Sequence, residues 1–177
     1  MSEAVLEVLE ILKYILPSGI VFLTAYHLVK KFLDDKRDMQ IMKARAESKK
    51  NVLPTKLQAY ERLILFLERI EPNNLVTRVH RSSMTAKVFQ HELLKTVRSE
   101  FEHNLTQQLY VSNDVWNSVN ASVQAVNQLI NLSLKNVTEN ATGLELSNVL
   151  FEIVSKAGVS PTAAAIKELK TEARQLL

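Results

Sequence analysis

The chain of 177 residues contains no cysteine, only three glycines and four prolines, and few aromatic residues. The absence of cysteine excludes a disulfide framework and any metal site built from thiolates. So few glycines and prolines leave little material for hairpin turns or glycine-rich loops. The sequence therefore predicts an all-α fold whose helices have few breaks.

Catalytic patterns are also missing: there is no glycine-rich phosphate loop, dinucleotide fingerprint or nucleophile-elbow serine. The stretch from His91 and Glu92 to Lys95 comes one residue short of the helical zinc-protease motif. That motif needs a second imidazole where this chain has Lys95, a cation that repels a metal. We therefore expect no enzyme activity, no cofactor and no metal site.

The longest run without a formal charge extends from Tyr14 to Val29 and is followed at once by Lys30 and Lys31. Extended to Leu33, it would cover roughly 30 Å as a helix, the thickness of a hydrocarbon core. The two lysines would then lie in the last turn, where their long stems can carry the charge to the headgroups. The run predicts a single transmembrane helix over 14–33, within an anchor of residues 1–33.

Basic residues follow the apolar run rather than precede it. Residues 1–29 contain one lysine, whereas residues 30–50 contain eight lysines and arginines against four acidic residues. By the positive-inside rule the C-terminal side is cytoplasmic and the N-terminus lies outside the inner membrane. We call the residues closest to the expected membrane surface the collar: Lys30, Lys31, Lys36 and Arg37.

Two other interpretations of the apolar run stay open. It could be a buried helix of a soluble protein, because the charge-free window is short and Glu7, Glu10 and Lys13 make the preceding turns amphipathic. It could also lie flat on a membrane surface. A cleaved signal peptide fits poorly, because the residues before the run are acidic rather than basic.

After the anchor, a charged juxtamembrane helix is expected over 34–52, and a helical bundle domain over 53–177. Pro54 predicts a break between them. Spacing of apolar residues predicts further helices over 55–71, 83–111, 114–138, 144–157 and 163–177. Ser112 or Asn113 is expected to cap the helix that starts at 114, and Gly158 to close the next one in a left-handed conformation. Ser160 is expected to cap the last helix.

The expected helix over 55–71 has two Glu-Arg pairs seven residues apart, which places them near one face. This ridge could dock a partner, or it could form ordinary salt bridges with neighbouring helices. The candidate partner surface includes two nearby arginines and is made of Glu61, Arg62, Glu68, Arg69, Arg78 and Arg81.

The expected helix over 114–138 has twenty consecutive residues without charge. Beside its apolar stripe runs a second stripe of five amide residues, each one position after an apolar residue. A lone lipid-facing span would not tolerate five amides, so we do not expect a second transmembrane helix. The amide stripe could join helices across an interface and set the oligomeric state, or face water on a bundle helix. It consists of Asn117, Asn120, Gln124, Asn127 and Asn131.

The stretch LPTKLQAYERLILFLERIEPNNLVTRV over residues 53–79 resembles a family of uncharacterised bacterial proteins of the Bacteroidota type. The resemblance extends over most of the chain. It implies a short N-terminal membrane segment, a charged helix and a helical domain, and it brings no activity or catalytic residue.

The sequence thus favours a membrane-anchored interaction or scaffold protein whose partners are the lipid bilayer and another protein or further copies of itself. The alternative is a soluble or peripheral helical regulator whose basic half binds anionic lipid or nucleic acid. Nucleic acid is the weaker choice, because no aromatic residues are interleaved with the lysines and no recognition motif is present.

Overall fold

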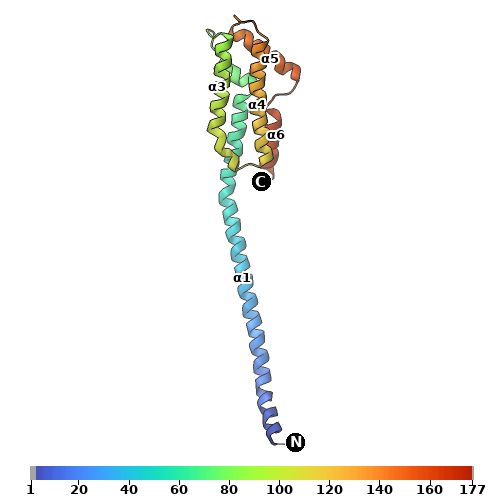
Figure 1. The fold of residues 1–177 in the computed structure, drawn as a ribbon. Helices are drawn as coiled ribbons and strands as arrows, with labels where there is room; N and C mark the ends of the chain where they lie inside the picture. The colour runs from blue at the N-terminus through green and yellow to red at the C-terminus, as the bar shows by residue number, and fades with distance from the viewer. Residues whose placement is uncertain (1–2, 177) are drawn as a thin grey trace. The chain divides into compact units, whose positions relative to one another are not determined.

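The computed structural model describes the backbone of residues 3–176, apart from the side chains of 3–9, 11, 12, 45, 46, 48, 49 and 51. Within this part of the chain the fold is all-α, as predicted, with one isolated bridge between Thr85 and Thr142. Figure 1 shows the elements α1 (Glu3–Ile70), α2 (Pro72–Val79), α3 (Ala86–Asn104), the 3₁₀ helix η1 (Leu105–Leu109), α4 (Asn113–Lys135), α5 (Gly143–Ala157) and α6 (Ala163–Arg174).

The chain forms two compact units, residues 1–51 and residues 52–177. The first consists of the N-terminal part of α1. The second contains the last turns of α1 together with α2 to α6, and it holds the hydrophobic core.

The predicted helix break at Pro54 is wrong, because α1 continues through this residue to Ile70. Proline removes one backbone donor and lowers helix propensity, but tertiary packing can override propensity. The turns that follow bury Tyr60, Leu63 and Leu67 almost completely, and this burial favours the helix.

The core of the second unit is built from one apolar stripe of each long helix. The stripe predicted over 55–71 is confirmed, with Leu63, Leu67 and Ile70 fully buried. They pack in a single cluster with side chains of the other helices, among them Phe89, Leu93 and Val97 of α3, Val119, Val126 and Ile130 of α4, Leu146 and Leu150 of α5, and Leu169 of α6.

Two of the three predicted helix caps form as expected. The Ser112 hydroxyl accepts from the Val115 N–H at the start of α4, and Gly158 closes α5 at φ 70°, both as predicted. The predicted cap at Ser160 is wrong: Thr162 precedes α6 and its side chain makes no capping bond. The Ser160 hydroxyl instead accepts from the Thr162 N–H at 3.3 Å, which forms a turn before the helix.

The helix predicted over 83–111 is shorter in the structure. It begins at Ala86, after a cap by Thr85, and gives way to η1 at Leu105. The long segment predicted from apolar spacing therefore contains two kinds of helix.

Among the residues that the structure describes, no helix combines the length and apolar content needed to cross a bilayer. The transmembrane span expected over 14–33 is therefore not supported.

Candidate functional site

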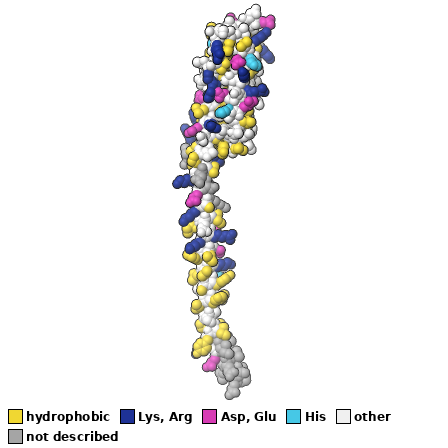
Figure 2. Space-filling view, turned by 90° about the vertical axis from the view of Figure 1, so that its left-hand side faces the viewer, with side chains coloured by type: hydrophobic (Ala, Val, Ile, Leu, Met, Phe, Trp, Pro, Cys, Tyr) yellow, Lys and Arg dark blue, Asp and Glu magenta, His cyan; other side chains and the backbone are white. Residues whose placement is uncertain are grey.

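The apolar segment of the first unit, residues 14–33, exposes large side chains all around α1. Ile20, Val21, Phe22 and Leu23 follow one another at about 100° steps, and each is more than half exposed. Figure 2 shows apolar side chains gathered along this part of the first unit. The members of the set are Tyr14, Ile15, Leu16, Ile20, Val21, Phe22, Leu23, Tyr26, Leu28, Val29, Phe32 and Leu33.

The serine and the threonine of this segment form hydrogen bonds within the helix. Ser18 donates to the carbonyl oxygen of Ile15, and Thr24 donates to that of Ile20, both at 2.8 Å. A polar group bonded to its own helix needs no water, so these residues do not demand an aqueous surrounding.

The collar residues Lys30, Lys31, Lys36 and Arg37 are all exposed. The Lys36 ammonium lies 4.6 Å from the centroid of the Phe32 ring, close enough for a cation–π contact. The charge of this lysine therefore lies beside the last turn of the apolar segment.

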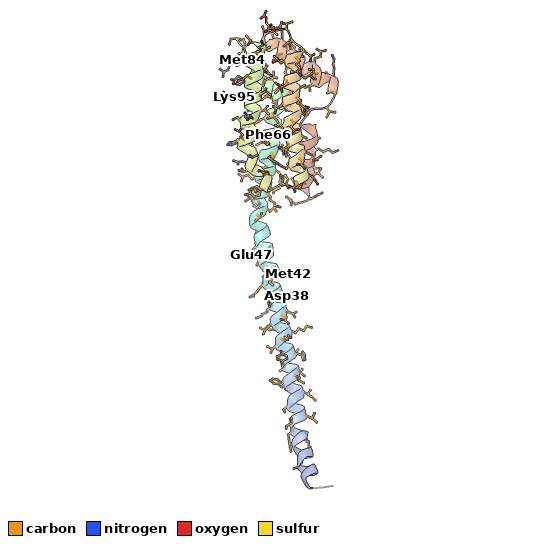
Figure 3. The ribbon with its side chains drawn as sticks, viewed as in Figure 1. Asp38, Met42, Glu47, Phe66, Met84 and Lys95 are labelled. Carbon is orange, nitrogen blue, oxygen red and sulfur yellow. The ribbon has the colours of Figure 1, made fainter. Side chains whose placement is uncertain are left out.

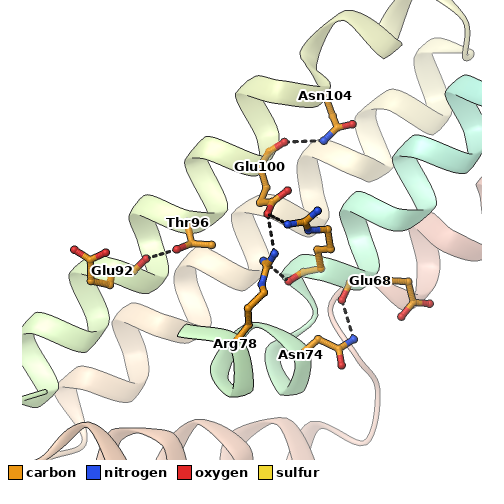
Figure 4. A network of polar contacts seen from close by, with 8 residues as sticks. Glu68, Asn74, Arg78, Glu92, Thr96, Glu100 and Asn104 are labelled. Carbon is orange, nitrogen blue, oxygen red and sulfur yellow. Dashed lines mark hydrogen bonds and ion pairs between the residues drawn. The ribbon is translucent and has the colours of Figure 1, made fainter. Parts of the chain in front are cut away.

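Part of the predicted charged ridge forms a salt-bridge network inside the second unit. Arg69 and Arg78 both reach Oε1 of Glu100 at 2.9 Å, and Arg78 also donates to the Arg69 carbonyl oxygen at 3.2 Å (Figure 4). The Glu100 side chain is only 15% exposed. One mostly covered carboxylate thus connects α1, α2 and α3, and this geometry favours the structural interpretation for these two arginines. No sequence pattern pointed to Glu100.

The remaining ridge residues, Glu61, Arg62, Glu68 and Arg81, are exposed. Glu68 lines an open groove of about 570 Å³ between the end of α1 and α6, opposite Lys167, Lys170 and Arg174. Arg78 and Arg81 line a second open groove of about 530 Å³ whose apolar members are Val79, Met84 and Val88. Three of the six predicted ridge residues thus line a groove: Glu68 lines the first, and Arg78 and Arg81 line the second.

The amide stripe lies along one edge of α4. Asn117, Gln124 and Asn131 are exposed, whereas Asn120 and Asn127 are half-buried. The Asn131 side chain accepts from Nε2 of Gln90 on α3 at 2.8 Å. Oδ1 of Asn127 is buried and has no hydrogen-bond partner among the described residues. The stripe therefore joins α4 to α3 at one end and presents amides to the surface elsewhere.

A polar cluster that the sequence analysis missed connects α1, α4 and α6. The Tyr60 hydroxyl donates to Oε1 of Glu172 at 2.5 Å, and the Ser112 N–H donates to the same oxygen at 2.9 Å. The Ser112 hydroxyl donates to the other carboxylate oxygen. Glu172 lies 112 residues after Tyr60, so no local pattern could pair them.

These contacts shift the pKa values of Tyr60 and Glu172 in opposite directions. Burial raises the pKa of the Tyr60 hydroxyl well above 10, and its bond to Glu172 and the carboxylate charge act in the same direction. For Glu172, partial burial alone would raise the pKa. Hydrogen bonds from Ser112 and Tyr60 and the charge of Lys56 outweigh it, so the pKa lies below the usual 4.5. Glu172 is therefore an ionised structural acceptor rather than a proton donor.

No three histidine, aspartate or glutamate side chains gather as a metal site would require, within the described residues. What the surfaces offer is an apolar helix, a basic collar, charged grooves and amides. These groups can bind lipid or protein.

The model of a family of unknown function, DUF7935, matches residues 6–176. This match extends over both units. No curated protein and no solved structure matches the chain.

Proposed function

We propose that this chain, which belongs to the family of unknown function DUF7935, is a non-catalytic interaction protein held at the inner membrane by residues 14–33. Its N-terminus lies outside and its helical bundle lies in the cytoplasm. The observation that carries the proposal is the exposure of large apolar side chains on every side of α1 between Tyr14 and Leu33.

A helix that is apolar all round needs an apolar surrounding, either a protein core or lipid. The core of the second unit is already closed by its own residues, from Tyr60 to Leu169. Lipid is the surrounding that can cover all sides of one helix at once. Each Leu, Ile, Val or Phe side chain removed from water contributes about 1.5–3 kcal/mol.

The described part of the segment falls short of the length and apolar content of an ordinary span. Support for the anchor therefore comes from three local features. The hydroxyls of Ser18 and Thr24 form hydrogen bonds within the helix. The basic collar follows the apolar segment directly. Before the segment, Lys13 is the one basic residue, as the positive-inside rule favours.

The bundle offers the surfaces for a protein partner. Arg62 and Arg81 are exposed, and neither forms an ion pair with another described residue. Asn117 and Gln124 add exposed amides on α4. We propose that such polar surfaces recognise a cytoplasmic protein, with the anchor keeping the complex beside the membrane.

The test is the fractionation of membranes that carry the full chain. We expect the protein to stay in the pellet after washing with high salt and with alkaline carbonate. A combined Val21→Lys and Leu23→Lys variant should be lost from the pellet. Each lysine at the centre of a span costs about 2.5–3.5 kcal/mol on the insertion scale.

The matched control adds the same two charges outside the segment, as Gln40→Lys and Ala44→Lys, at positions that are also exposed. This control should remain in the pellet. Release of the unmodified protein by salt alone would show a peripheral, electrostatic association instead. Its release by carbonate would refute insertion.

A further inference from the structure

The open groove of about 530 Å³ beside α2 and α3 lies entirely within the second unit, and we call it the α2–α3 groove. One wall comes from the end of α2, the rim from the loop that follows, and the other wall from α3. The α3 wall consists of Val88, Glu92 and Thr96. These residues follow one another at intervals of four and therefore share one face of the helix.

The α2–α3 groove has apolar side chains beside its charged ones. Val88 is 51% exposed, and Val79 and Met84 are half-buried. Met84 lies beside the start of α3, and Lys95 lies further along the same helix (Figure 3). A partner bound in the groove would remove this apolar surface from water, which favours association.

Arg78 is already held in place where it lines the groove. Its Nη1 donates to Oε1 of Glu100 at 2.9 Å and its Nη2 donates to the Arg69 carbonyl oxygen at 3.2 Å, yet the side chain is 35% exposed (Figure 4). A guanidinium has five N–H donors, so further donors remain for a ligand. Because the two bonds restrict this side chain, ordering it around a carboxylate costs less entropy than ordering a mobile arginine.

Positive charge exceeds negative charge at this groove. Arg69 and Arg78 share a single carboxylate, that of Glu100, so one positive charge of this network stays uncompensated. Arg81 lines the same groove, is exposed, and forms no ion pair with another described residue. The groove therefore offers two guanidinium groups to an anionic partner.

The acidic side of the balance is small. Among the described residues that line the groove, Glu92 is the one acid. Its carboxylate lies 4.0 Å from the ammonium of Lys95 on the same helix, which offsets part of its charge. Anionic bilayers are recognised by clusters of about 4–8 lysines and arginines, more than Arg78 and Arg81 provide. Two cations beside apolar side chains fit a protein segment better.

We propose that the α2–α3 groove binds an acidic segment of a cytoplasmic partner protein, with Arg78 and Arg81 pairing to its carboxylates and Val88 contacting its apolar side chains. This inference rests on the proposed function, because it gives the chemistry of the protein partner that the bundle recognises. Arg78 is the fixed anchor for one carboxylate, and Arg81 is the free cation for a second. A neutral or basic segment would cover both guanidinium groups without a counter-charge, which is costly.

The test exposes the full chain in detergent to a library of random short peptides displayed on phage. We expect the enriched peptides to carry Asp or Glu next to apolar residues. A selected peptide should bind Arg81→Glu about tenfold more weakly than the unmodified chain, because the reversed charge repels its carboxylate. The matched control is Arg98→Glu, which reverses an arginine that is 82% exposed on α3 outside the groove, and it should leave the affinity unchanged.

A charge swap separates recognition from a general effect of the substitution. Replacing the acid of the selected peptide by lysine should abolish binding to the unmodified chain and restore binding to Arg81→Glu, because opposite charges face each other again. Peptides without acids, no enrichment at all, or equal losses for Arg81→Glu and Arg98→Glu would overturn the proposal. An oligonucleotide that binds through Arg81 while no peptide is enriched would assign the groove to nucleic acid instead.

Membrane fractionation of the unmodified chain is independent of this result. A chain that stays in the pellet but enriches no acidic peptide refutes only the groove as a binding site. A chain that binds the peptide but is washed from the membrane refutes only the anchor.

Discussion

Deleting residues 1–51 should give a soluble and fully folded helical domain. All residues of the hydrophobic cluster lie between Tyr60 and Leu176, so the deletion removes none of them. It does remove the exposed apolar side chains of residues 14–33. We expect the 52–177 fragment to be monomeric without detergent and to unfold cooperatively, as followed by circular dichroism and light scattering.

The full chain is the comparison for this experiment. In detergent it should show the same unfolding midpoint for its bundle as the fragment does. A fragment that aggregates or has lost its helical signal would show that the first unit belongs to the folded core, and the anchor proposal would then fail.

Replacing Phe89 by alanine should cost about 3–5 kcal/mol of unfolding free energy, the range for a large aromatic residue removed from a core. Phe89 is 0% exposed. Its ring packs edge-on against His80 at 5.3 Å between centroids, and its Cβ lies close to Gly143 of α5. The total unfolding free energy of a small domain is about 5–15 kcal/mol, so this single substitution could remove most of the stability of the bundle.

The neighbouring residue provides the matched control. Val88 is 51% exposed on the same turn of α3, and Val88→Ala should change stability by less than about 0.5 kcal/mol. Urea denaturation of both variants in the 52–177 fragment measures the difference. Similar losses for the two would mean that α3 does not pack with Phe89 toward the core.

Periodicity predicted the bundle well, because burial in a helical protein repeats every three to four residues along the chain. The α4 stripe shows this clearly: Val119, Val126 and Ile130 are buried as their spacing requires. Capping by Ser112 and the left-handed Gly158 depend only on immediate neighbours, and they too could be predicted.

The errors arose where tertiary context overrides local preference. Pro54 lies inside α1 because the turns that follow are fixed by the core. The Glu172 cluster joins residues far apart in sequence, so only the folded chain brings Tyr60 and Ser112 to one carboxylate. The same reason hides Glu100, although its partners Arg69 and Arg78 belong to the predicted ridge.

The most direct measurement of the central claim is thiol labelling of intact cells, with single cysteines introduced as Glu10→Cys, Leu23→Cys or Ser99→Cys. An impermeant maleimide should label position 10 in intact cells and position 99 only after lysis, because a lipid-inserted segment separates the two sides. Position 23 should react only after denaturation. Labelling of position 23 in the native protein, or the same labelling of 10 and 99 in intact cells, would contradict an anchor over residues 14–33.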